Sequence, residues 1–213
     1  QSKGFDISEQ SIFISTNLKP YFLDSNLKSI EIKLNNIEHI PITADIHVKL
    51  FALQVPKNHL RSRYWAKPDV MKYSQAEFKS FFPNDIYDKE DQMDQWKEIS
   101  TVLDQNFSSA SVFKIDFLKL LKQGAYKIII EATKENGAIE KLTEYTIVYD
   151  KNSKNSSLKP YVLSQQEILE SNSKALFTAL SMDEDYHMLI QYSSRSHNEL
   201  NWKKISKNAM YEY

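Results

Sequence analysis

The sequence has 213 residues, enough for one large domain or two modest ones, and its 41% hydrophobic and 26% charged residues are typical of a globular rather than a disordered chain. A formal net charge of −1 argues against a general binder of polyanions, whose surface needs an excess of basic residues. The chain has no cysteine, which excludes disulfides, thiolate metal sites and cysteine nucleophiles, and its three glycines cannot form a GxGxxG or GxxxxGK[ST] phosphate loop.

The first fifty positions alternate apolar and polar residues, which predicts strands of an antiparallel sheet with one face buried. Strands resume at 111–117, and residues 126–133 and 139–149 flank Asn136-Gly137, a strong hairpin signal. These elements predict a β-sandwich of six or seven strands. The inward side chains of the two clearest early strands are predicted to be Ile30, Ile32, Leu34, Ala44, Ile46, Val48 and Leu50.

The strand pattern stops between about 54 and 110, and we expect a helical and irregular insert there. Ser74 and Glu77 form a capping-box signature, and Pro83 ends the helix that they begin. Further along, Met93 and Trp96 recur at helical spacing. The insert therefore should have structure of its own.

The polar stretch 151–159 is predicted to be a linker that separates two domains. The first domain, 10–150, contains the sandwich and its insert. The second, 160–213, contains four short strand patterns over about half the length of a complete sandwich, so we expect a small or truncated β domain. The predicted fold class is mainly β throughout, with helix confined to the insert.

Two motifs resemble those of bacterial alpha-2-macroglobulin family proteins. An L-x-x-G-x-Y approach to a strand (Leu121, Gly124, Tyr126) resembles their macroglobulin-like β-sandwich domains, although immunoglobulin-like modules share it. An R-x-R-x-W-x-x-P-D element followed by F-P-x-D-x-Y is similar to a segment of the very large Bacteroidetes members. Its residues here are Arg61, Arg63, Trp65, Pro68, Asp69, Phe82, Pro83, Asp85 and Tyr87.

The resemblance implies a non-catalytic structural module of a large parent chain that traps proteases or protects the cell envelope. It also implies a periplasmic or cell-surface location, with neighbouring domains of the parent, proteases or envelope proteins as partners. The thioester of that family needs a cysteine and lies in another domain, so no functional residue carries over. We expect no enzyme activity, cofactor, nucleic-acid partner or membrane span in this segment. The alternative is a free-standing surface module that binds a glycan or a protein through the insert.

The candidate surface in the insert consists of Arg61, Arg63, Tyr64, Trp65, Pro68 and Asp69. Residues 54–73 carry a net charge of +4, and residues 84–98 carry −4, which predicts that the basic arm folds against the acidic arm or against the sandwich. On that structural interpretation Arg61, Arg63 and Trp65 are buried and bonded to carboxylates or carbonyls of the same chain. On the alternative interpretation they lie exposed and bind a partner.

Other polar residues point to no particular chemistry. The five histidines are scattered, and none forms an HExxH pair. Two acidic stretches, 84–94 and 182–187, lack the spacing of a calcium loop and are expected to be solvated rather than metal-binding. Aromatic residues gather in the insert, where a small satellite core is favoured over a sugar platform.

Overall fold

The computed structural model describes residues 12–23, 29–58, 60–61, 63–116, 121–134, 137–150, 158, 161–164, 177–181, 185–193, 198–206 and 209–212. The chain divides into two units, one formed by residues 1–54 and 93–149 and the other by residues 55–92 and 150–213. Strands dominate both, and the one α-helix of the described residues has seven residues. The predicted mainly β fold class is confirmed. No helix among the described residues is long and apolar enough to cross a membrane.

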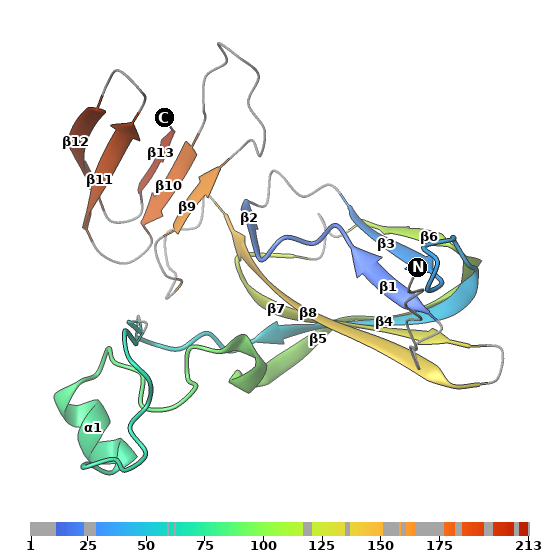
Figure 1. The fold of residues 1–213 in the computed structure, drawn as a ribbon, viewed down its shortest axis with the longest axis horizontal. Helices are drawn as coiled ribbons and strands as arrows, with labels where there is room; N and C mark the ends of the chain where they lie inside the picture. The colour runs from blue at the N-terminus through green and yellow to red at the C-terminus, as the bar shows by residue number, and fades with distance from the viewer. Residues whose placement is uncertain are drawn as a thin grey trace, which may run out of the picture. The chain divides into compact units, whose positions relative to one another are not determined.

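The first unit is a sandwich of two β-sheets that face each other (Figure 1). The smaller sheet has the order β1-β3-β6, with β1 at Phe13–Thr16, β3 at Ile30–Asn35 and β6 at Val112–Ile115. The larger sheet has the order β2-β8-β7-β4-β5. Its strands are β2 at Tyr21–Leu23, β4 at Ala44–Leu53, β5 at Glu98–Ala110, β7 at Gly124–Thr133 and β8 at Ile139–Tyr149. All neighbours are antiparallel except β2 and β8, which pair in parallel.

Alternate side chains of the central strands fill the space between the sheets, as their sequence pattern predicts. Ile32 and Leu34 of β3 lie opposite the larger sheet, and Ile46 and Val48 of β4 belong to the same core cluster, all at most 2% exposed. Burying each such side chain contributes about 1.5–3 kcal/mol. The core therefore fixes which face of each strand points inward.

The outward side of β4 carries charge instead. His47 Nε2 lies 2.5 Å from an oxygen of Asp104 on β5, and Glu131 on β7 lies within 4 Å of both His47 and Lys49. Lys141 on β8 approaches Glu131 from the other side, at 3.6 Å. The outer face thus has a cross-strand charge network, and His47 has the outward position that the alternation predicts.

The chain enters β7 through a tyrosine corner, a bend that is common in immunoglobulin-like sandwiches. The Tyr126 hydroxyl donates to the carbonyl of Lys122 at 2.8 Å and accepts from the Lys122 N–H at 3.0 Å. Burial raises the pKa of this phenol, although the hydrogen bond to Lys122 opposes the shift. Leu121 and Tyr126 are both buried, so the L-x-x-G-x-Y motif has a structural role here.

The β7–β8 hairpin predicted from Asn136-Gly137 is present. Thr133 pairs with Ile139, and Gly137 lies in the connection with a φ of +81°, a conformation that glycine adopts without steric cost. Asn136 itself is outside the described residues.

The prediction of a helical and irregular segment over 54–110 is wrong at its C-terminal end. Residues 98–110 form β5, and the expected helix around Met93 and Trp96 is reduced to a three-residue 3-10 helix, Met93–Gln95. The reason is that β5 pairs with β4 through three register shifts, which break the period-two pattern in its sequence. From here on, "the insert" means residues 55–92. Its two ends meet, because Leu53 pairs with Glu98 and the Gln54 N–H donates to the Lys97 carbonyl at 2.8 Å.

The described residues of the C-terminal part form five strands. The four predicted ones are present as β9 at Tyr161–Ser164, β10 at Phe177–Ser181, β11 at Tyr186–Ser193 and β12 at Asn198–Ile205, and a fifth, β13, spans Ala209–Glu212. They form a sheet of order β13-β10-β9 and a β11-β12 hairpin. Nearly all of the predicted linker, 151–157 and 159, lies outside the described residues.

The tyrosine corner gives a first prediction. Tyr126→Phe removes both hydrogen bonds to Lys122 in a buried site, so the free energy of unfolding of the sandwich should fall by about 1–3 kcal/mol. Urea denaturation followed by far-ultraviolet circular dichroism measures this. Tyr64→Phe is the matched control, since that side chain is 95% exposed and its loss of a hydroxyl should change nothing. Equal stability of both variants would contradict a structural role for the corner.

Candidate functional site

The insert consists of a basic arm and an acidic arm that lie against each other, as the opposite charges predict. The Arg61 N–H donates to the carbonyl of Asn84 at 2.7 Å, and Arg61 forms a parallel bridge with Asp85. The side chain of Asn58 reaches the carbonyl of Pro83 at 3.2 Å. The arms are therefore joined by backbone as well as side-chain contacts.

Among the described residues, two ion pairs connect the two arms and a third joins the insert's helix to the acidic arm. Arg61 donates through Nε to one oxygen of Asp85 at 2.9 Å, and its Nη2 lies 2.8 Å from the same oxygen. Lys67 contacts Asp88 at 2.6 Å, and Lys79 of the helix contacts Glu90 at 3.2 Å. The Arg61 side chain is 72% exposed, and exposed pairs of this kind contribute about 1 kcal/mol or less. These ion pairs therefore contribute little to the stability of the insert.

Arg63 makes a different kind of contact. Its Nη2 donates to the carbonyls of Ile86 and Tyr87, the second at 3.0 Å, in a partly buried position. Charged donors to carbonyls that are shielded from water contribute about 1.5–3 kcal/mol. Arg63 is thus the polar anchor of the insert, as the structural interpretation expects.

The helix of the insert, α1 at Gln75–Phe81, begins as its sequence predicts. Ser74 accepts from the Glu77 N–H while the Glu77 side chain accepts from the Ser74 N–H, a complete capping box. The helix ends before Pro83, with Phe82 at its C-cap. This short helix presents Phe78 to the acidic arm.

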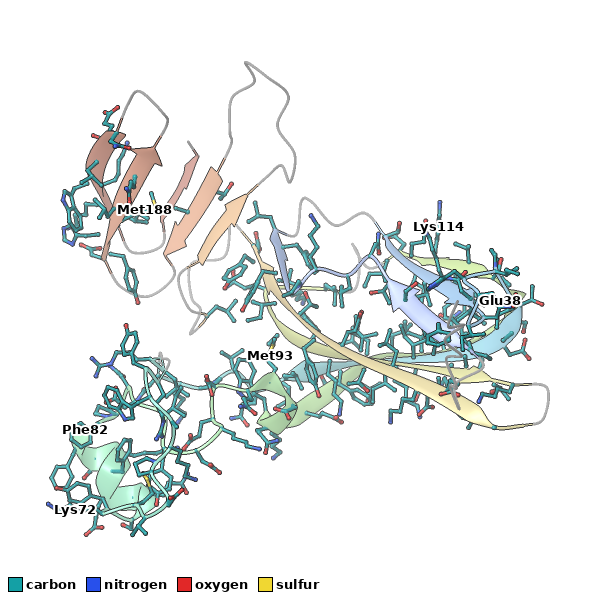
Figure 2. The ribbon with its side chains drawn as sticks, in the orientation of Figure 1. Glu38, Lys72, Phe82, Met93, Lys114 and Met188 are labelled. Atoms are coloured by element: carbon teal, nitrogen blue, oxygen red, sulfur yellow. The ribbon has the colours of Figure 1, made fainter. Side chains whose placement is uncertain are left out.

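A small core holds α1 to the arms. The Phe78 ring packs on Tyr87 and Phe82, with ring centroids 5.4 and 5.2 Å apart, and Leu60 and Ile86 of the two arms are also buried. Phe82, at the end of α1 in Figure 2, is 42% exposed. The aromatic residues thus form only a partial satellite core.

A hollow of about 450 Å³ opens between α1 and the two arms. This volume lies in the range of small-ligand sites. Five of the six candidate residues line it, and Asp69 does not. The lining comprises Arg61, Arg63, Tyr64, Trp65, Pro68, Met71, Phe78, Phe82, Asp85 and Ile86.

The burial expected for Trp65 and Arg61 is wrong. Trp65 is 72% exposed and Tyr64 is 95% exposed, and only Arg63 is partly buried. The physical reason is that the core of the insert is filled by Phe78, Tyr87 and Ile86, which leaves the two aromatic rings at the rim of the hollow. The arginines contact the same chain, whereas Trp65 does not pack into it.

The carboxylate of Glu90 is the most perturbed acid of the insert. Burial alone would raise its pKa, but the backbone N–H groups of Asp88 and of Glu90 itself, together with the side chains of Gln75 and Lys79, lower the pKa from 4.5 to about 2. Its oxygens accept from Asp88 N–H at 2.7 Å and from Gln75 at 3.2 Å. Glu90 therefore fastens α1 to the acidic arm, through Gln75 in the first turn and Lys79 in the last.

Other polar groups of the described chain form no further site. Asp85, Asp88 and Glu90 are paired with cations, and His187 lies exposed on β11. Among the described residues, no group of three or more histidines and carboxylates is placed to hold a metal ion. Residues 182–184 of the second acidic stretch are outside those described.

No model of a known protein family matches the sequence, and no curated protein matches it. Among solved structures, the chain is similar to E. coli alpha-2-macroglobulin in its native conformation, determined by cryo-electron microscopy. The identity is 4% and the TM-score is 0.36, over 98% of this chain. The chain spans 14% of the length of that protein. The fold class therefore rests on the strand pairing described above.

The contacts of the two arginines give a second prediction. Arg63→Ala leaves the carbonyls of Ile86 and Tyr87 without their donor and should destabilise the insert by about 1.5–3 kcal/mol. Arg61→Ala removes only an exposed pair and should cost about 1 kcal/mol or less. Amide hydrogen exchange in α1 measures both. A larger loss in the Arg61 variant would show that the insert is held by its ion pairs instead.

The lowered pKa of Glu90 gives a third prediction. Since the folded pKa is about 2 and the ordinary value is 4.5, the stabilisation is complete above about pH 4.5 and is lost as the pH falls toward 2. It amounts to roughly 1–2 kcal/mol, because solvent screens part of the interaction. A carbon-13 NMR titration of the Glu90 carboxyl should have its midpoint near pH 2, and Lys79→Ala should raise that midpoint. A midpoint near 4.5 in the unmodified chain would contradict the hydrogen-bonded geometry.

Proposed function

We propose that the chain is a non-catalytic structural module of a large alpha-2-macroglobulin-like protein. The observation that supports the proposal is the tyrosine corner of Leu121, Gly124 and Tyr126 within a two-sheet sandwich, because that corner is one of the two motifs on which the sequence resemblance rests. The second motif of the resemblance lies in the arms of the insert, where Arg63 and Asp85 make structural contacts. The contacts of Tyr126, Arg63 and Asp85 thus support the structural role that the proposal assigns to the chain.

In this proposal residues 10–150 are a macroglobulin-like domain, 151–159 are a linker, and 160–213 belong to a second β domain of the same parent chain. The parent chain traps proteases or protects the cell envelope, in the periplasm or at the cell surface. The module contributes a rigid sandwich whose partners are its neighbouring domains, with proteases or envelope proteins met by the parent.

A non-catalytic role fits the polar groups of the described residues. Asp85 is paired with Arg61, and His47 contacts Asp104 and Glu131 on the outer face of the larger sheet. The hollow of the insert has one carboxylate, Asp85, and it is already paired with Arg61. A general acid and base in mutual reach is the minimum for most hydrolytic chemistry, and the described lining of the hollow has no second carboxylate and no histidine.

A second candidate function is binding of a glycan or a protein through the insert. The exposure of Tyr64 and Trp65 beside the hollow favours it, since large aromatic rings held in water are typical of recognition surfaces. Such binding is compatible with the first proposal. If the chain is a free-standing surface module, binding through the insert is its entire function.

The native gene tests the first proposal. We expect the reading frame around these residues to encode further sandwich domains, and elsewhere a bait region or a cysteine-containing thioester segment. We also expect the isolated chain not to inhibit a protease. It should not become attached to one through a thioester either, because it has no cysteine. The measurements are the gene sequence and a protease assay with gel electrophoresis. A frame that encodes no other sandwich domain would overturn the module and leave the second candidate.

A further inference from the structure

The rim of the hollow carries two aromatic side chains with no use in the fold of the insert. Trp65 and Tyr64 are consecutive, 72% and 95% exposed, and the small core is formed without them. Val70 of the same arm is 84% exposed. Exposed apolar surface of this kind contributes a favourable free energy only when a binding partner buries it away from water.

The floor of the hollow suits an apolar side chain rather than a sugar. Met71, Phe78, Phe82 and Ile86 line it with carbon atoms. The backbone carbonyls of the adjoining acidic arm already accept hydrogen bonds from the basic arm. The carbonyl of Pro83 accepts from Asn58, and that of Asn84 accepts from Arg61. The carbonyls of Ile86 and Tyr87 both accept from Arg63. A sugar ring seated on this floor would lose hydrogen bonds to water with few partners in exchange, which costs about 1–3 kcal/mol for each hydroxyl.

The wall of the hollow offers donors for carboxylates. Arg61 contacts a single oxygen of Asp85 through Nε and Nη2, and Arg63 uses only Nη2. Among the described residues, Nη1 of Arg61 and both Nη1 and Nε of Arg63 have no hydrogen-bond partner. With two guanidinium groups and one carboxylate, the lining has a net positive charge. A guanidinium group binds a carboxylate with two parallel hydrogen bonds, so the complementary ligand is anionic.

We infer that the hollow of the insert binds a protein segment in which an apolar side chain is flanked by carboxylates. The apolar side chain fills the hollow over Phe78 and Ile86, under the Trp65 and Tyr64 rings. The flanking carboxylates contact the unused donors of Arg61 and Arg63. This inference rests on the second candidate function and names its ligand. It does not require the chain to be part of an alpha-2-macroglobulin-like protein.

The test uses the full chain and a fluorescein-labelled octapeptide of glutamates around a central phenylalanine–leucine pair, followed by fluorescence anisotropy. Two further probes replace the glutamates with glutamines or the central pair with serines. We expect saturable binding of the first probe that weakens with added salt, and a loss of about tenfold or more for each of the other two.

Matched variants localise the binding. Trp65→Ala should weaken the acidic probe about tenfold or more, whereas Trp202→Ala should leave its affinity unchanged, because Trp202 on β12 is equally exposed at 71% but distant in the chain. Both changes are at exposed positions, and unfolding curves of both should match the unmodified chain.

Three results would overturn the inference: no binding of the acidic probe up to about 1 mM, equal binding of the glutamine probe, or equal effects of the two tryptophan changes. Competition by a soluble oligosaccharide such as maltoheptaose, sensitive to Trp65→Ala, would also overturn it. Competition by the oligosaccharide would mean that the insert is a binding site for glycans. The proposed ligand would then be wrong, but the second candidate function would stand.

Discussion

Side-chain alternation along β4 is the constraint on which the rest of the structure depends. Its inward residues Ile46 and Val48 are almost fully buried, and its outward residue His47 reaches Asp104 on one neighbour and Glu131 on the other. A slip of one residue would put the charges in the core and the apolar side chains in water. Because β4 lies between β5 and β7 in the larger sheet, its register also fixes the pairing of both, and with it the point at which the insert leaves the sandwich.

Much of this fold follows from short-range sequence signals. Regular alternation in β3 and β4, the Asn136-Gly137 hairpin and the capping box at Ser74 each depend on neighbours in the sequence. β2 has three residues, too few to show a period, and it pairs in parallel with a strand 126 residues further along the chain. β5 is hidden for another reason, since its bulges change which face successive residues occupy. Such long-range and irregular pairings leave no periodic trace.

The candidate site was predictable in its charges and not in its exposure. Opposite net charges in two nearby segments indicate that the arms meet, and the pairs of Arg61 with Asp85 and Lys67 with Asp88 confirm it. Whether Trp65 or Phe78 fills the small core of the insert depends on where the two arms lie relative to each other, which the sequence pattern does not give. Residue type gives no answer, because both side chains are large and apolar and the segment has only seven helical residues to set a periodicity. Trp65 is left outside as a result.

The bond between Gln54 and Lys97 closes the insert at its base. Since both ends leave from one point on a paired edge of β4 and β5, a segment of any length can be accommodated there with little change in loop-closure entropy, about 0.6 kcal/mol for each doubling. The sandwich therefore tolerates replacement of the segment that connects β4 to β5. A different segment at this point could present a different recognition surface while the strands, their core and their register stayed as they are.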